Sequence, residues 1–492
     1  MKRTKIVCTI GPASETQATI ERLISAGMNV ARLNFSHNVH SHHAMLIKNI
    51  RAASKKKGVP VAILQDLQGP RIRIGKLPED GIELKKGNTI TLTPKAGKLS
   101  DNIIPIQLPS LYKYVKAGHS ILIDDALLQL KVTGVSKPNI KARVVVGGIL
   151  KSNKGMNFPN SSIKVPAVTT KDKRDLVFGI KQNVDFVALS FVSKAEEIVA
   201  LRKQIVALEK KFGWERKNNQ VKAGQGERAP LYTRIIAKIE RKEALQNFDE
   251  ILAVADGIMI ARGDLGIELP IQDLPLFQKR FIQKCNKAGK PVIVATQMLD
   301  SMIQRPVPTR AEVSDIANAI LDGTDAIMLS GETATGKYPL KAVQVMNKVA
   351  QHTEPAEIKL VSEPAKRSGQ GPSITESTTL AAETIAEMSG AKVIVCSTAA
   401  GFAVRSVIRN KPRFPVVAVT AFEKTQRQLS LSWGVSAFVT PPYKKLSELI
   451  SYVNTLLKEH KLAKSGDRIV ICSSHPYGYI GHANLIKIET VK

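Results

Sequence analysis

The chain is organised around Arg234-Ile-Ile-Ala-Lys-Ile-Glu240, which is followed by Met259-Ile-Ala-Arg-Gly-Asp-Leu-Gly266. Both stretches are apolar runs that end abruptly in charge, a pattern typical of buried parallel strands whose carboxyl ends open into a site. Lys238 and Glu240 lie two residues apart, so on a strand their side chains point to the same side. Asp264 follows after one strand–helix–strand interval, which predicts two carboxylates at the ends of neighbouring strands, about 4.8 Å apart.

These residue types predict a divalent cation site and phosphate chemistry. Two carboxylates beside a lysine favour Mg²⁺, which takes few protein ligands and leaves its other positions to water and phosphate oxygens. Gly263 and Asp264 begin a predicted short helix, whose free amides are suited to a carboxylate or a phosphate. Thr296 ends another strand-like run, where its hydroxyl could hold substrate, orient water, transfer a proton or bond a loop.

The composition indicates a globular protein of two to four domains. The chain has 492 residues, of which 43 % are hydrophobic. No segment approaches eighteen uninterrupted apolar residues, and the first residues lack an apolar stretch of signal-peptide length, so we expect a cytoplasmic protein without membrane contact. The cysteines lie far apart and predict buried free thiols, neither disulfides nor a zinc site: Cys8, Cys285, Cys396 and Cys472.

The net charge of +30 is compatible with a nucleic-acid partner or with small anionic substrates. Basic residues are densest between Arg202 and Arg228. This stretch contains Phe212 and Trp214 but lacks the alternation of aromatic and basic residues that stacks bases. We therefore interpret it as a solvated loop, and nucleic acid is the less favoured partner.

Eight apolar strand-like runs alternate with segments of helical period, which predicts a closed parallel barrel. The runs are Lys5–Gly11, Asn29–Phe35, Val61–Asp66, Asp185–Phe191, Ile235–Glu240, Gly257–Gly263, Pro291–Gln297 and Asp325–Gly331. Barrel enzymes place their sites where such strands end. Polar residues gather there, namely Asn34, Ser36, Asp66, Lys238, Glu240, Asp264, Thr296, Ser330 and Glu332.

The alternation is interrupted after the third run. Residues 70–166 contain Gly and Pro punctuation and short alternating strands such as Gly118–Asp124, which predicts an all-β insertion between barrel residues 1–69 and 167–353. A hinged lid that excludes water is the functional interpretation, and a passive insertion is the alternative. After a polar stretch from about 354 to 372, five more strand-like runs predict a C-terminal open α/β domain over 354–492.

Three features each have a functional and a structural interpretation. Arg32, in a run that should be buried, needs a counter-anion, either bound phosphate or a carboxylate such as Asp66. The stretch 331–337 resembles a P-loop, but Tyr338 stands where the Mg²⁺-binding Ser or Thr belongs, so we interpret it as a chance match. Four clustered histidines fit an exposed loop and first helical turn better than a zinc site: His37, His40, His42 and His43.

With these residues in place, the chain resembles the pyruvate kinase family. The resemblance runs from Thr4–Pro12 to Ile486–Glu489 and includes long signatures. They are Ile236–Glu240, Met259–Gly266, Ala295–Leu299, Pro308–Asp315 and Asn318–Ser330. The segment Asp66-Leu-Gln-Gly-Pro-Arg-Ile-Arg73 is similar to the bacterial branch of the family.

The resemblance implies phosphoryl transfer from phosphoenolpyruvate to ADP, giving pyruvate and ATP. It implies that Glu240 and Asp264 hold Mg²⁺, for which Mn²⁺ can substitute, while Arg32 and Lys238 meet the transferred phosphate. Thr296 would lie beside the carbon that is protonated. Substrate binding would also involve Arg73 and backbone amides near Gly263 and Asp264, with the insertion closing over the nucleotide.

The resemblance also implies properties outside the reaction centre. Relatives are generally homotetramers. Relatives that need K⁺ bind it at positions matching Asn34, Ser36 and Asp66, and they carry Glu where Arg71 stands, so we expect no K⁺ requirement here. The loop containing Thr398 and Gly401 matches an effector site but offers few hydroxyls, which favours a phosphosugar or nucleotide monophosphate as effector.

Two rival functions remain from the sequence. A Mg²⁺-dependent barrel lyase or aldolase acting on pyruvate also needs two carboxylates, but it has no use for a nucleotide lid. A nucleic-acid-binding role would predict affinity that falls steeply with salt.

Overall fold

The computed structural model describes residues 2–94, 102–161, 163, 165–214, 232–360, 373–475 and 483–492. Part of the basic stretch Arg202–Arg228 lies outside these residues. Its first ten residues belong to helix α4 (Ala195–Lys211), so the loop interpretation is wrong for 202–211. The reason is that Leu201 and Ile205 bury one face of α4 while its other face carries the charges.

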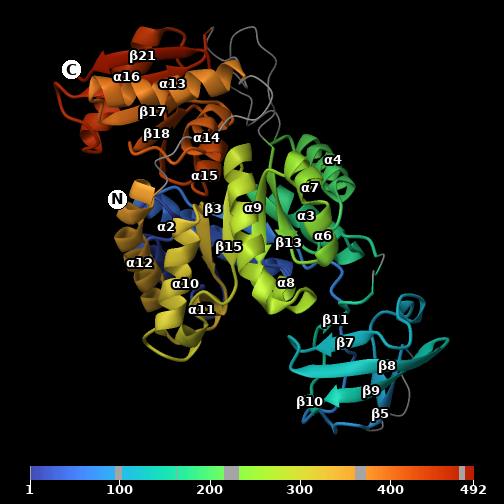
Figure 1. The fold of residues 1–492 in the computed structure, drawn as a ribbon. Coiled ribbons are helices and arrows are strands. Elements are labelled where there is room, and N and C mark those ends of the chain that lie inside the picture. The colour runs from blue at the N-terminus through green and yellow to red at the C-terminus, as the bar shows by residue number, and fades with distance from the viewer. Residues whose placement is uncertain are drawn as a thin grey trace.

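Eight parallel strands close into a barrel at the centre of the molecule, in the order β1-β16-β15-β14-β13-β12-β3-β2 (Figure 1). The strands are β1 (Lys5–Thr9), β2 (Val30–Asn34), β3 (Ala62–Asp66), β12 (Phe186–Leu189), β13 (Arg234–Ile239), β14 (Gly257–Ala261), β15 (Val292–Ala295) and β16 (Ala326–Leu329). Their register is continuous around the ring; for example, Ile236 lies opposite Gly257 and Val7 opposite Val30. The predicted fold class is confirmed.

Helices cover the outside of the barrel and bury their apolar faces against the strands. They are α1 (Gln17–Ala26), α2 (His40–Lys57), α3 (Thr170–Lys181), α4, α6 (Lys242–Gln246), α7 (Phe248–Val254), α8 (Arg262–Glu268), α9 (Leu274–Ala288), α10 (Arg310–Leu321), α11 (Gly331–Ala334) and α12 (Pro339–Leu360). Local sequence sets their ends: Thr16 caps α1 by accepting a hydrogen bond from the Thr19 amide, and Gly27 ends it with φ 119°.

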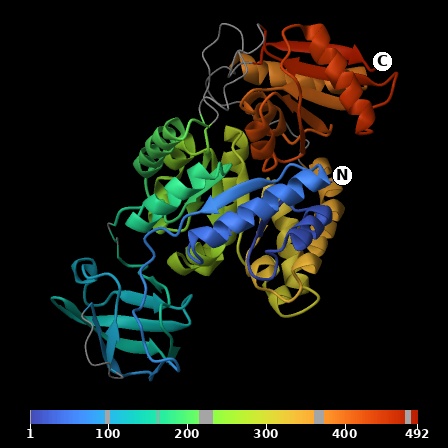
Figure 2. The same ribbon diagram turned by 180° about the vertical axis from the view of Figure 1, so that it is seen from behind.

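The insertion after β3 is an all-β unit that hangs from one end of the barrel, seen from both sides in Figures 1 and 2. Its strands are β4 (Ile82–Leu84), β5 (Thr89–Thr93), β6 (Ile103–Pro105), β7 (Ser120–Ile123), β8 (Leu128–Ser136), β9 (Asn139–Val146), β10 (Gly148–Leu150) and β11 (Met156–Asn157). They form a six-stranded sheet and a two-stranded sheet around a separate apolar core.

The C-terminal α/β domain packs against the opposite end of the barrel (Figure 1). Its elements are α13 (Ile374–Ser389), β17 (Val393–Ser397), α14 (Phe402–Ile408), β18 (Val416–Thr420), α15 (Glu423–Leu429), β19 (Val435–Val439), α16 (Leu446–Glu459), β20 (Arg468–Ser473) and β21 (Leu485–Thr490). The sheet order is β19-β18-β17-β20-β21, with β21 antiparallel to β20.

Three further features of the described residues bear on the expectations from sequence. The first residues of the polar stretch from about 354 to 372 belong to α12, which continues to Leu360 and contains Pro355. The four cysteines are buried free thiols, as predicted. Within the described ranges, no helix is both long and apolar enough to cross a bilayer.

Candidate active site

Lys238 lies near the carboxyl end of β13, where oxygen atoms surround its ammonium group. Its Nζ is 2.9 Å from Glu240 Oε1 and 3.2 Å from Asp66 Oδ1, and it donates a hydrogen bond to Ser190 Oγ at 2.8 Å. Burial alone would lower the pKa of Lys238, but Asp66 and Glu240 raise it above its ordinary value. Lys238 is therefore a buried cation that stays protonated, held at the end of the barrel that faces the insertion.

Asp66, at the end of β3, joins Lys238 to Arg32. Arg32 Nε lies 2.7 Å from Asp66 Oδ2, and the arginine also donates to Thr9 Oγ1 at 2.9 Å. Of the two counter-anions considered from the sequence, the structure contains the carboxylate. Burial would raise the pKa of Asp66, but Lys238 and Arg32 lower it below its ordinary value. Arg32 and Lys238 thus share the Asp66 carboxylate, and Lys238 also contacts Glu240.

Glu240 and Asp264 supply the oxygen donors for a divalent cation. The Glu240 carboxylate contacts Lys238 and accepts a hydrogen bond from the Phe191 amide at 2.7 Å. Burial raises the pKa of Glu240; Lys238 opposes this shift, while the negative charge of Asp264 adds to it. Asp264 Oδ1 lies 3.4 Å from Arg71 Nη2. Each carboxylate is thus balanced by a cationic side chain.

This donor set fits Mg²⁺. Magnesium binds through one or two carboxylates and keeps its other positions for water and phosphate oxygens. Among the described residues, no cluster of three or more His, Cys, Asp or Glu side chains forms a fuller metal cage. Two carboxylates without sulfur or imidazole ligands beside them suit a hard cation.

Thr296 follows β15 in a strained backbone conformation. Its φ is 71° and that of Gln297 is 55°, a left-handed region that costs a β-branched residue about 1–3 kcal/mol. The Gly263 amide donates to Thr296 Oγ1 at 2.8 Å, so this amide of α8 is already occupied by the threonine. Arg262 Nη2 donates to the Thr296 carbonyl at 2.8 Å, and its Nη1 pairs with Asp315 at 2.7 Å. These contacts fix the hydroxyl beside Asp264.

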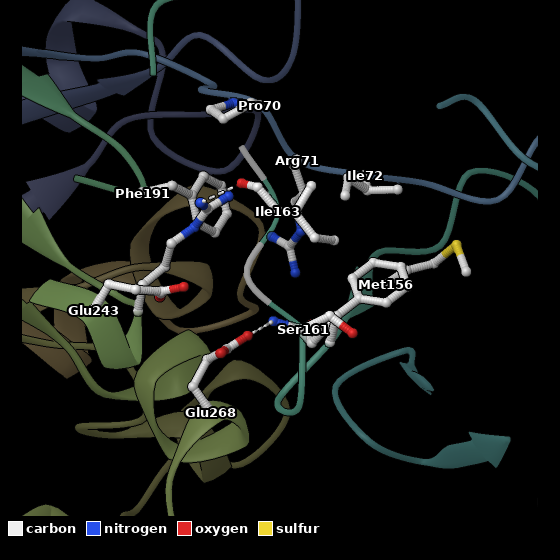
Figure 3. Close-up of a pocket in the computed structure, with 12 residues that line it drawn as sticks. Pro70, Arg71, Ile72, Met156, Ser161, Ile163, Phe191, Glu243 and Glu268 are labelled. Atoms are coloured by element: carbon white, nitrogen blue, oxygen red, sulfur yellow. Dashed lines mark hydrogen bonds between the residues drawn. The ribbon is translucent and has the colours of Figure 1, made fainter. Parts of the chain in front are cut away.

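A cleft between the insertion and the barrel adjoins these groups (Figure 3). Arg71 points into it, and Glu243 and Glu268 line other parts of its wall. Few contacts cross the cleft in the described ranges, among them Asn157 Nδ2 to Glu268 Oε1 at 3.4 Å. This sparse contact is compatible with a hinged insertion.

Two arginines at the hinge reach in different directions. Arg73 Nη1 donates to the Asn153 carbonyl of the insertion at 2.9 Å, and burial followed by repulsion from Arg71 lowers its pKa. Arg71 pairs with Asp264 of the barrel and, at 3.4 Å, with Asp125 of the insertion. Its side chain is 29 % exposed, so Arg71 does not simply extend into solvent.

The positions matched to a monovalent-cation site, Asn34, Ser36 and Asp66, lie at the ends of β2 and β3 or just beyond. Asn34 pairs with Asp66 across β2 and β3, and Asn34 Oδ1 accepts a hydrogen bond from the Ser36 amide at 3.1 Å. The carboxylate of Asp66 is engaged by Arg32 and Lys238. The three residues are therefore neighbours, and the Asp66 carboxylate is already paired with two cations.

The P-loop-like stretch 331–337 and the histidine cluster both make contacts within the protein. The amides of residues 334–337 all donate to backbone carbonyls, so they form no P-loop cradle. The Glu332 carboxylate accepts hydrogen bonds from the Leu299 and Ser330 amides. It therefore holds two loops of the barrel together and is not available to a substrate. His40 contacts Asp175 at 2.7 Å, and His43 stacks on Phe35.

The loop proposed for an effector follows β17 at the far end of the barrel. Thr398 Oγ1 accepts a hydrogen bond from the Gly401 amide at 2.8 Å, which closes the loop on itself. The carbonyl of Ala399 accepts from Thr425, and that of Ala400 accepts from Arg234 of the barrel. The loop is thus part of the contact between the C-terminal domain and the barrel.

Sequence reasoning missed three residues that build the site: Ser190, Phe191 and Arg262. Ser190 Oγ bonds Lys238 and donates to the Leu67 carbonyl at 2.7 Å. Phe191, at φ 56°, turns its amide toward Glu240. Arg262 could have been recognised, because it lies inside the signature Met259–Gly266. Ser190 and Phe191 carry no charge that would have distinguished them in the sequence.

Comparison with known proteins agrees with this geometry. A family model described as "Pyruvate kinase, barrel domain" matches residues 1–343, and one described as "Pyruvate kinase, alpha/beta domain" matches residues 376–489. The chain belongs to the pyruvate kinase family. This membership makes it a phosphotransferase of the pyruvate kinase type.

Individual pyruvate kinases match over the whole chain. The enzyme of Geobacillus stearothermophilus is 42 % identical over 494 residues, covering 100 % of this chain and 80 % of its own length. The pyruvate kinase of Clostridium acetobutylicum is 42 % identical over 494 residues, which cover 100 % of this chain and 100 % of that enzyme. The crystal structure of a pyruvate kinase from Cryptosporidium parvum superposes with a TM-score of 0.90 at 36 % identity, covering 100 % of this chain and 96 % of that one.

Proposed function

We propose that the chain transfers a phosphoryl group from phosphoenolpyruvate to ADP at the site formed by Lys238, Arg32, Glu240, Asp264 and Thr296. The observation that carries this proposal is the buried Lys238 ammonium, held between Asp66 and Glu240 at the end of the barrel that faces the cleft. A phosphotransferase site of this kind works by positioning and by charge stabilisation. The domain limits 1–69, 70–166, 167–353 and 354–492 and a homotetrameric assembly belong to the same proposal.

Each side chain of the site has its own role in the proposed reaction. Arg32 and Lys238 offset the charge of the transferred phosphate, and Lys238 also balances the enolate that remains. Mg²⁺ or Mn²⁺ held by Glu240 and Asp264 supplies Lewis-acid polarisation of substrate oxygens. We assign the protonation of the enolate carbon to the neighbourhood of Thr296, whose position is fixed by contacts with Gly263 and Arg262.

Binding and closure complete the proposed reaction. Arg73 and the backbone amide of Asp264 orient the substrate, since the Gly263 amide is taken by Thr296. The insertion closes over the nucleotide and excludes water. Exclusion of water strengthens the charge interactions of Lys238 and Arg32, because the effective dielectric constant falls.

The test of the reaction is ADP-dependent pyruvate formation, read through a coupled dehydrogenase. We expect pyruvate to form from phosphoenolpyruvate only when ADP and Mg²⁺ are both present. A barrel lyase or aldolase would form no pyruvate from phosphoenolpyruvate and ADP, and that result would contradict the proposal. Pyruvate formed without ADP would mean that water accepts the phosphoryl group, which would contradict it as well. Weak, sequence-independent binding of nucleic acid at low salt would leave it intact.

We predict that activity does not require K⁺. Arg71 places a permanent positive charge 3.4 Å from Asp264, where added K⁺ would meet like charge. Two unit charges 4 Å apart repel by about 4 kcal/mol at an effective dielectric near 20. Turnover in tetramethylammonium salts should therefore match turnover in K⁺ salts at the same ionic strength. Activation by K⁺ of more than about tenfold, worth 1.4 kcal/mol, would show that Arg71 does not replace the ion.

A regulatory role of the loop at Thr398 and Gly401 is a further prediction. The loop has one threonine hydroxyl and two alanines, so we expect activation by a phosphosugar or a nucleotide monophosphate, if the loop binds an effector. Initial rates at subsaturating phosphoenolpyruvate measure this. Strong activation by micromolar fructose 1,6-bisphosphate with none by the monophosphates would refute the prediction.

A further inference from the structure

The insertion of residues 70–166 carries an excess of positive charge that the proposed reaction does not use. It contains 16 Lys and Arg residues and 6 Asp and Glu residues, so it supplies a third of the chain's net charge of +30. The proposed reaction gives roles to Arg71 and Arg73 at the hinge. Other cations of the insertion lie on its sheet.

Three of these cations share the outer face of the six-stranded sheet, on strands β8 and β9, which lie side by side in Figure 1. Lys131 of β8 lies directly opposite Arg143 of β9, and Lys141 precedes Arg143 by two residues, so the three side chains point to the same side. All three residues are exposed, whereas Ala142 and Val144, which alternate with them on β9, are buried in the core of the insertion. We call Lys131, Lys141 and Arg143 the cationic face.

The cationic face brings like charges together without a counter-ion. Lys131 and Arg143 form a directly opposite pair, and like charges in such a pair destabilise a sheet. In the described part of the insertion, the six strands of this sheet contain no Asp or Glu, and none of the three cations forms an ion pair. Asp124, for example, pairs with Lys154 at 2.8 Å. An anion bound across Lys131 and Arg143 would offset their repulsion.

Hydroxyl side chains lie among these cations. Each cation has a hydroxyl residue directly opposite it on a neighbouring strand: Ser120 opposite Lys131, Thr89 opposite Arg143, and Thr91 opposite Lys141. Strand geometry holds neighbouring cations about 5–7 Å apart. Lysine, arginine, serine and threonine side chains all bind the phosphate oxygens of nucleic acids. The face therefore presents charges and hydroxyl donors in an array that suits a chain of phosphates.

We propose that the cationic face binds single-stranded nucleic acid through its phosphates, independently of base sequence. Strands β5, β7, β8 and β9, all within the described residues, contain no aromatic side chain on which a base could stack. Affinity therefore comes from the phosphates and falls as salt is added. The surface goes beyond the proposed reaction and does not depend on it.

The surface fits a single strand better than a duplex or an anionic bilayer. A duplex groove admits a helix or a two-stranded ribbon, and a sheet of four strands is wider than either. Membrane-bound surfaces combine cations with large apolar side chains that enter the bilayer, whereas the residues opposite these cations carry hydroxyls.

Fluorescence anisotropy of a labelled oligouridylate with the full chain, measured over a range of salt concentrations, tests the proposal. The test variant combines Lys131→Gln, Lys141→Gln and Arg143→Gln. Each lost phosphate contact should lower the slope of log affinity against log salt by about 0.7, so the slope should fall by about 2. Affinity at about 0.1 M salt should fall by at least about tenfold.

The matched control removes the same charge from another cluster. It combines Lys55→Gln, Lys56→Gln and Lys57→Gln, three exposed lysines at the end of α2. Its affinity should stay within about twofold of wild type, because these lysines are not part of the bound surface. Oligouridylate bound at the active site contributes equally in all three proteins. An equal loss of affinity in the two variants would overturn the proposal, because it would show attraction by net charge alone.

Two further measurements separate binding from folding and from lipid. Lys131→Gln alone should lower the slope by about 0.7, and it provides the test if the triple variant does not fold. An unchanged slope in Lys131→Gln would contradict the assignment. Vesicles that contain phosphatidylserine should bind more weakly than oligouridylate. Tighter binding of these vesicles, lost in the triple variant, would assign the face to a membrane surface and overturn the proposal.

Discussion

Lys238→Met should lower turnover by at least about 10²-fold, the scale seen when one preorganised charge stabiliser is removed. The ammonium group lies 2.9 Å from Glu240 and 3.2 Å from Asp66. In the proposed reaction it offsets the charge that develops on the transferred phosphate and on the enolate. Methionine keeps the length of the side chain but carries no charge. Turnover at saturating phosphoenolpyruvate, ADP and Mg²⁺, read by the coupled assay, measures the loss.

The matched control for this variant is Lys284→Met. Lys284 lies on α9 and pairs with Asp249, whose side chain is 73 % exposed, so turnover should stay within about twofold, since exposed pairs contribute little. Circular dichroism should show that Lys238→Met is folded, and its affinity for phosphoenolpyruvate should change less than its turnover. A Lys238→Met enzyme within about threefold of wild-type turnover would remove the role assigned to Lys238.

Lys424→Met should destabilise the contact between the C-terminal domain and the barrel by about 3–5 kcal/mol. Lys424 of α15 lies 2.9 Å from Glu209 of α4 and donates to Thr233 Oγ1 at 2.9 Å. Both charged side chains are at most 3 % exposed, so removing the lysine leaves the Glu209 charge buried without its cation. Denaturant unfolding, followed by far-ultraviolet circular dichroism, should show the first transition at lower denaturant concentration.

A double variant distinguishes loss of the charge balance from loss of packing. Lys424→Met with Glu209→Gln removes both charges, and we expect it to regain most of the stability lost in the single variant. Lys284→Met again serves as the exposed control, at about 1 kcal/mol or less. A single variant as stable as wild type would mean that water reaches Glu209 and that the pair contributes little.

The barrel could be predicted because each of its strands is a continuous apolar run that ends in a polar residue. The contact of Lys238 with Glu240 followed from the period of a strand, since residues two apart share a side. The partner of Arg32 could not be chosen, because phosphate and Asp66 satisfy the same desolvation requirement. Only the position of β3 next to β2 decides that Asp66 is within reach.

Other parts of the site depend on tertiary geometry. Ser190 and Phe191 act through a hydroxyl and an amide, which a sequence pattern does not distinguish from ordinary strand ends. Arg71 reaches both Asp264 and Asp125 only because the insertion folds beside the barrel. The polar stretch from about 354 did not reveal that its first residues continue α12, because polar composition does not distinguish a helix from a linker. Lys424 and Gln428 have the residue types of a solvated helix face, yet α15 buries both in a domain contact.

Anomalous diffraction from crystals grown with Mn²⁺ and phosphoenolpyruvate, without ADP, tests the placement of the reaction most directly. We predict one strong Mn²⁺ peak per chain with a carboxylate oxygen of Glu240 and one of Asp264 within about 2.2 Å, and with Lys238 Nζ and Arg32 in contact with the phosphate. Asp264→Asn crystals should lose most of this peak. A peak away from both carboxylates, or phosphoenolpyruvate bound without contact to Lys238, would contradict the account.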